Sequence, residues 1–149
     1  MITFIKTWKR FNMENKINYG PLTGLIGTWE GNKGLDIAPE SDGSEEHNPY
    51  YERLFFEEGW SVTNAEKQTS SVVKYHQVVK RKSTNEVFHD EVGHWLWDAD
   101  NNTIIRSFTI PRAVAIVAGG TYKTNKESKE VVLEVSASVG DSDWEIAQS

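Results

Sequence analysis

The sequence predicts an all-β protein built as one antiparallel up-and-down β-barrel. Segments rich in β-branched and aromatic residues recur along the chain, turn residues separate them, and no long segment has the periodicity of a helix. Polar residues occupy both faces of the expected strands, which favours a barrel with a partly polar interior over a sandwich with a dry core. A chain of 149 residues is long enough to bury the core of one such domain.

The elements of the first half follow from local composition. Residues 1–12 are apolar and basic and are expected to form a tail, so the barrel domain is expected to span residues 13–149. Residues 20–27 combine glycine and proline with leucine, which predicts a turn or a single helical turn that plugs the core. The other segments expected here are a strand at 27–37, an acidic loop at 38–49 and an aromatic-rich strand at 50–58.

The second half is predicted to consist of consecutive hairpins. Asp100, Asn101 and Asn102 tolerate positive φ and lie between two strand-like segments, as expected of a hairpin turn. No internal repeat is visible. The expected strands lie at 69–82, 86–100, 103–110, 114–122 and 130–139.

Composition argues against several classes of function. The formal net charge of −6 and the pI of about 5.2 disfavour a general nucleic-acid binder. The chain has no cysteine, which removes disulfides, thiolate metal sites and cysteine nucleophiles and suits a cytoplasmic protein. No run approaches 18 consecutive apolar residues, so no segment is expected to span a membrane.

The segment FHDEVGHWLWD, residues 88–98, concentrates side chains that can carry chemistry. On a strand, successive side chains alternate between the two faces, so the two histidines of this segment are expected to point apart. In a helix, their separation of five residues is also poor for joint ligation. A self-contained two-histidine metal site is therefore disfavoured. One face is expected to carry His89, Glu91, Gly93, Trp95 and Trp97, and the other Phe88, Asp90, Val92, His94, Leu96 and Asp98.

His89 and Glu91 are the strongest candidates for a ligand site. As neighbours on one face they could hydrogen-bond, shift each other's pKa, or line a cavity beside Trp95. A histidine held only by its neighbours at one end of the barrel explains the same pattern without a ligand. His76 is expected on the adjacent strand, but the doubled valines around it leave its face undecided.

Four stretches of the sequence together resemble the nitrobindin family of haem-binding β-barrels, which are related in shape to fatty-acid-binding proteins and lipocalins. The stretches are LTGLIGTWEGNKG, YYERLFF, VFHDEVGHWLWD and AIVAGGTY, and the similarity runs over about residues 22–122. Gly27, Trp29 and Gly31 match the family signature G-x-W-x-G-x-G. Its last glycine falls one position late, at Gly34. The resemblance implies a closed antiparallel barrel of about eight to ten strands with a ligand cavity.

The resemblance also implies a function. The cavity of this family holds haem b, binds nitric oxide and is credited with isomerising peroxynitrite to nitrate, so haem b is the expected cofactor and peroxynitrite isomerase the implied enzyme activity. His89 falls where members of the family carry a histidine on the distal side of the haem, and Phe88 falls where an apolar pocket neighbour lies. Glu91, Trp95 and His76 complete the residues expected to contact the cofactor.

The resemblance has one departure, at the carboxyl terminus. The proximal histidine of the family comes from late strands, whereas all four histidines of this chain lie at or before His94. Two explanations are open: the chain lacks the closing strands of the barrel, or this branch does not ligate haem as the family does. In the first case, the unclosed edge could pair with a second copy in a homodimer. The alternative function is a non-enzymatic carrier or sensor of a small apolar ligand, a fatty acid or a tetrapyrrole, in the same cavity.

Overall fold

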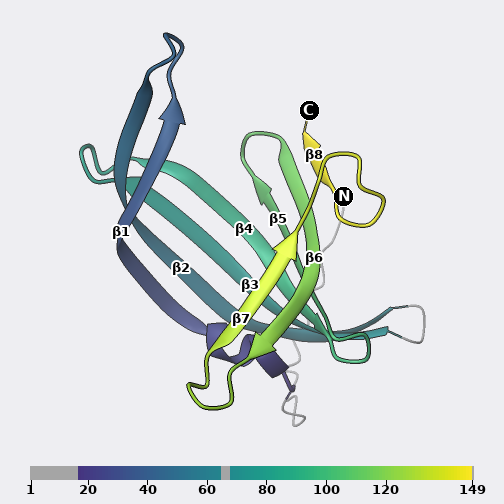
Figure 1. The fold of residues 1–149 in the computed structure, drawn as a ribbon. Helices are drawn as coiled ribbons and strands as arrows, with labels where there is room; N and C mark the ends of the chain where they lie inside the picture. The colour runs from purple at the N-terminus through teal and green to yellow at the C-terminus, as the bar shows by residue number, and fades with distance from the viewer. Residues whose placement is uncertain (1–16, 65–67, 149) are drawn as a thin grey trace, which may run out of the picture.

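The computed structural model describes residues 17–64 and 68–148, which form a short 3₁₀ helix and one antiparallel sheet of eight strands (Figure 1). The tail predicted at residues 1–12 lies outside the described residues. In the described part of the chain, no helix is long and apolar enough to cross a membrane. The elements are η1 (Gly20–Leu25), β1 (Gly27–Pro39), β2 (Glu45–Asn64), β3 (Gln68–Arg81), β4 (Val87–Asp98), β5 (Thr103–Ile110), β6 (Val114–Thr124), β7 (Val131–Ser136) and β8 (Ile146–Gln148).

The order of the strands confirms the predicted fold class. Strands β1 to β7 follow one another across the sheet in sequence order, each antiparallel to the next, and β8 pairs with β6. The sheet curves strongly, so that one of its faces is concave (Figure 1). The path ends at β1 on one side and at β7 on the other, and these two strands do not pair within residues 17–64 and 68–148. The closed barrel that the resemblance implied is therefore not formed here.

The acidic segment predicted as a loop at 38–49 belongs mostly to the first hairpin. Residues 45–49 pair with residues 35–39 as the outer part of β1 and β2. The turn is confined to 40–44, where the carboxylate of Asp42 accepts a hydrogen bond from the backbone N–H two residues on. The loop prediction was wrong because backbone pairing holds this hairpin arm together, and such pairing needs no alternation of apolar residues.

A β-bulge in β1 explains the displaced glycine of the signature. Gly31 lies opposite Glu52 and Gly34 opposite Tyr50, so β1 advances by three residues while β2 advances by two. The bulge absorbs the additional residue and restores the register of the strand. A Cβ on Gly34 would lie 2.0 Å from the ring of Tyr50, so this position accepts only glycine unless the ring moves.

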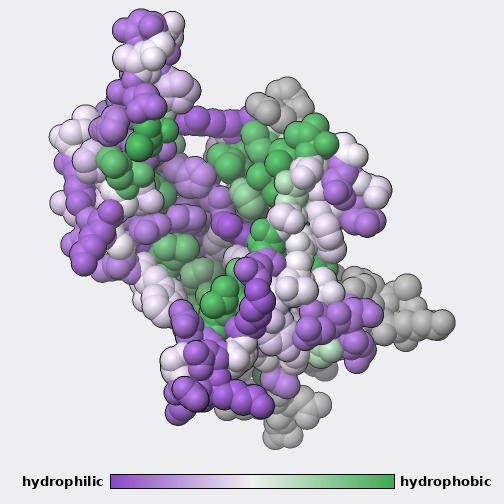
Figure 2. All heavy atoms as spheres, viewed as in Figure 1, coloured by the Kyte–Doolittle hydropathy of each residue, from purple (hydrophilic) through white to green (hydrophobic). Residues whose placement is uncertain are grey.

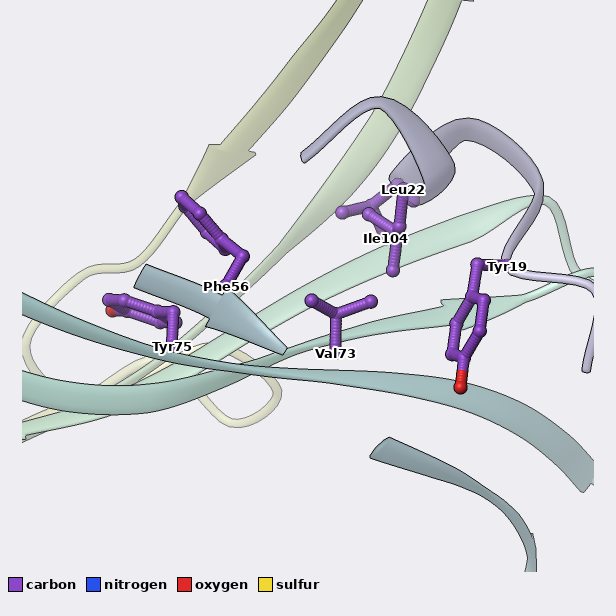
Figure 3. Packing of buried hydrophobic residues seen from close by; sticks show 6 residues of the cluster. All are labelled: Tyr19, Leu22, Phe56, Val73, Tyr75 and Ile104. Atoms are coloured by element: carbon purple, nitrogen blue, oxygen red, sulfur yellow. The ribbon is translucent and has the colours of Figure 1, made fainter. Parts of the chain in front are cut away.

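The core lies on the concave face, at the end of the sheet that η1 closes (Figure 3). Leu22 of η1 is fully buried there, which contributes about 1.5–3 kcal/mol to folding. Gly20 begins the helix with φ of +51°, and a Cβ at this position would lie 2.4 Å from the ring of Trp97. The plug predicted at 20–27 is thus confirmed. The buried cluster consists of Tyr19, Leu22, Phe56, Val73, Tyr75 and Ile104.

Candidate functional site

Strand β4 presents three of the predicted residues to the concave face, which is called the inner face below. Gly93 lies opposite Tyr75, a member of the core, so the alternate residues of β4 share its face. These are His89, Glu91 and Trp95, as the alternation predicted. Glu91 is buried, and His89 and Trp95 are half-buried. Figure 2 shows the molecule hollowed in the middle of this view, with both hydrophobic and hydrophilic side chains reaching the hollow.

A network of polar side chains surrounds Glu91 on the inner face. Its Oε1 accepts hydrogen bonds from the hydroxyl of Tyr75 and from Nη2 of Arg106, the latter at 2.5 Å. Arg106 also donates from Nε to the oxygen of Tyr75 at 3.0 Å. Nε2 of His89 lies 3.4 Å from Oε2 of Glu91. The carboxylate and the guanidinium therefore compensate each other's charge, and the histidine is the one member of this network with a ring nitrogen left for a ligand.

Burial decides the protonation of Tyr75. Its side chain is 4% exposed, and this burial raises the pKa of the phenol well above its usual value of 10.0. The hydrogen bond to Glu91 raises the pKa further, and the nearby Arg106 only partly opposes the shift. Tyr75 is consequently a neutral hydrogen-bond donor at any physiological pH.

Aromatic rings hold the guanidinium of Arg106 in place. Its Cζ lies 4.5 Å from the ring centroid of Phe108, 5.3 Å from that of Tyr75 and 5.4 Å from that of Trp95. These are distances at which a cation is attracted to the face of a ring. The centre of the inner face is therefore an aromatic surface, and the guanidinium of Arg106 is fixed beside these rings with its charge compensated by Glu91.

Phe88 departs from the alternation that placed it on the opposite face. Val79 pairs with His89 and Lys80 with Val87, so Phe88 is the additional residue of a β-bulge in β4. Its ring meets the ring of Tyr50 edge-on, with centroids 6.2 Å apart and an interplanar angle of 64°. The bulge thus lets Phe88 join the inner-face residues next to His89, and the prediction from strict alternation was wrong at this position.

The other three histidines lie away from this site. His76 is exposed on the outer, convex-side face of β3, where its Nε2 lies 2.9 Å from Oδ1 of Asp90. His94 shares that outer face, and His47 lies in the first hairpin. The structure therefore does not bring His76 together with His89. No group of three or more metal-ligating side chains occurs in the ranges 17–64 and 68–148.

Arg106 and Tyr75 are the members of the Glu91 network that the sequence did not single out. Arg106 is the one charged residue of TIIRSFTI, and a lone cation in such a strand signals a buried partner. Tyr75 carried no such signal, since an aromatic residue is ordinary in a strand.

The family model described as "THAP4-like, heme-binding beta-barrel domain" matches residues 18–145. The chain therefore belongs to this family of haem-binding β-barrel domains. The match confirms the resemblance to nitrobindins. No curated protein and no solved structure matches the chain.

The residues of the inner wall fit a haem in two respects. The wall offers aromatic surface from Phe88, Trp95 and Phe108, which suits a flat apolar ring. It also offers the imidazole of His89 beside a buried carboxylate, an arrangement that orients a metal-ligating histidine. The described strands after β4 carry no histidine that could supply a second ligand.

Proposed function

We propose that the inner face of this domain binds haem b and that His89 is the axial ligand of the iron. The observation that carries the proposal is the position of His89. Of the four histidines of the chain, all within the described residues, it is the one on the inner wall, and a buried carboxylate holds it. The resemblance placed His89 on the distal side of the haem. Because the described strands after β4 carry no histidine, we assign the axial role to His89.

The residues of the chain would have distinct tasks in this function. Glu91 would orient the His89 ring by accepting a hydrogen bond from its ring N–H, and Arg106 and Tyr75 would fix the position of the Glu91 side chain. Phe88 and Trp95 would contact the ring and keep water from it. The bound iron supplies the site at which nitric oxide binds and peroxynitrite is isomerised to nitrate in the family, and we extend that activity to this chain as part of the proposal.

A hemin titration followed at the Soret band tests the proposal. Wild type should give a sharp band that saturates at one haem per chain. Removing a residue that only supports a metal ligand lowers affinity by roughly 10–100-fold. Because His89→Ala removes the ligand itself, its loss of hemin affinity should be at least as large. Glu91→Gln should lose affinity within that range.

His76→Ala is the matched control, since it removes an exposed imidazole from the opposite face. It should titrate like wild type. Equal titrations of wild type and His89→Ala would overturn the axial assignment, and a broad, non-saturating band in wild type would overturn haem binding. Circular dichroism should confirm that each variant is folded. Nitrate formation from peroxynitrite, with and without bound hemin, tests the isomerase activity.

A second candidate function is that of a carrier of a small apolar ligand, such as a fatty acid. The observation that favours it is the exposure of the inner face, on which Trp29 of the edge strand β1 is 51% exposed. Such a carrier would change its tryptophan fluorescence when a fatty acid is added without iron. A saturable change of this kind, together with a negative hemin titration, would favour the carrier over the haem protein.

A further inference from the structure

The end of the sheet opposite η1 is the open mouth of the inner face. Trp97, at the end of β4, contacts the start of η1 at Gly20, whereas Phe88 lies at the other end of the same strand. The hairpins that join β1 to β2, β3 to β4 and β5 to β6 lie at this mouth (Figure 1). A ligand enclosed between η1 and the mouth would therefore have one edge among the core residues and one edge near the hairpins.

Two arginines flank Phe88 at the mouth. The guanidinium of Arg81, the last residue of β3, lies 4.7 Å from the ring centroid of Phe88. Arg112, in the turn after β5, has Nη2 3.5 Å from the backbone oxygen of Phe88. Arg81 is on the inner face, because it lies opposite Tyr50, whose ring covers Gly34 on that face. Both arginines therefore contact Phe88, the residue that immediately precedes His89 in the chain.

The charges of these two arginines are available to a ligand. Nε of Arg81 donates to Asn48 at 3.1 Å, but its carboxylate neighbour Glu46 is 4.0 Å away, at the limit of an ion pair. Arg112 is exposed and forms no ion pair within the described residues. Arg106 differs from both, because the buried Glu91 compensates its charge at 2.5 Å. The mouth thus carries two incompletely paired guanidinium groups on a protein whose formal net charge is −6.

We propose that Arg81 and Arg112 bind the two propionate carboxylates of a tetrapyrrole whose ring lies against Phe88 and His89. The inference rests on the proposed function and defines the ligand further, as a flat ring with two carboxylates on one edge. A guanidinium recognises a carboxylate through paired N–H donors, and two such groups at the mouth match the two propionates of haem b. His89 lies opposite Val79, two residues or about 7 Å along β3 from Arg81, which separates the ligating imidazole from the carboxylate site.

Fluorescence titrations with protoporphyrin IX and with its dimethyl ester test the proposal without iron. The two rings differ in their carboxylate charges and not in the macrocycle. Wild type should bind the free acid more tightly than the ester. Arg81→Gln and Arg112→Gln should each weaken binding of the free acid by about 3–5-fold, as expected for partly exposed charge pairs, and leave binding of the ester unchanged. The double variant should bind both rings equally.

Arg53→Gln is the matched control. Arg53 is an exposed arginine on the outer face of β2, 3.8 Å from Glu30, and its replacement should not change the preference for the free acid. Equal affinity of wild type for acid and ester, a preference retained by the double variant, or no binding of either ring would overturn the inference. A preference that depends on Arg81 and Arg112, together with a hemin titration without a sharp Soret band, would support the carboxylate site and overturn axial ligation by His89.

Discussion

Replacing Glu91 with alanine should lower the free energy of unfolding of the ligand-free protein by about 3 kcal/mol. The Glu91 side chain is 5% exposed and accepts hydrogen bonds from both Tyr75 and Arg106. Removing one partner of a buried ion pair costs roughly 3–5 kcal/mol. Arg106 retains its hydrogen bond to Tyr75 and keeps 27% of its side chain exposed, which places the loss at the lower end of that range. For a domain of this size, the melting temperature should fall by roughly 10 °C.

Urea unfolding followed by circular dichroism measures this loss. Glu57→Ala is the control, because Glu57 pairs with Lys74 at 3.0 Å on the partly exposed outer face, where such a pair contributes at most about 1 kcal/mol. A loss in Glu91→Ala no larger than in the control would refute the view that the buried carboxylate organises the inner wall. Adding Arg106→Met to Glu91→Ala should recover part of the loss, because no unpaired guanidinium then remains in the wall.

Three further perturbations test other features of the structure. Because burial raises the pKa of Tyr75, the unfolded chain releases a proton above about pH 10 that the folded chain retains. Above that pH, the free energy of unfolding of wild type should therefore fall more steeply than that of Tyr75→Phe. Equal slopes of this free energy against pH, measured by urea unfolding, would contradict the prediction. Gly20→Ala should cost at least about 1 kcal/mol in thermal unfolding, since φ is +51° and the ring of Trp97 occupies the place of the Cβ, whereas Gly24→Ala, with nothing within 4 Å, should be neutral. Sedimentation velocity should detect self-association of wild type through the open edge of the sheet. Ile37→Lys should weaken this association, because Ile37 is 52% exposed on the edge strand β1. A monomer at every concentration would count against edge pairing.

Local patterns were enough to predict the fold class and part of the site. The order of strands, the plug at 20–27 and the common face of His89, Glu91 and Trp95 all depend on short-range composition and on the two-residue period of a strand. The same period failed at Phe88. A bulge arises from the pairing of β4 with β3 and has no reliable signal in either strand alone. The doubled valines beside His76 left its face open for a similar reason, and the pairing of β3 with β2 decided it.

By itself, the sequence determined that this chain is an all-β domain of a haem-binding family and that one strand turns a histidine and a carboxylate to the same side. Only the tertiary structure decided that Glu91 is held by Tyr75 and Arg106, that two arginines meet at Phe88, and that the sheet stays open between β1 and β7. The direction of a side chain on a strand is a property of the local backbone. The partner it meets is set by the register of strands 15 to 31 residues away along the chain, which no local pattern specifies.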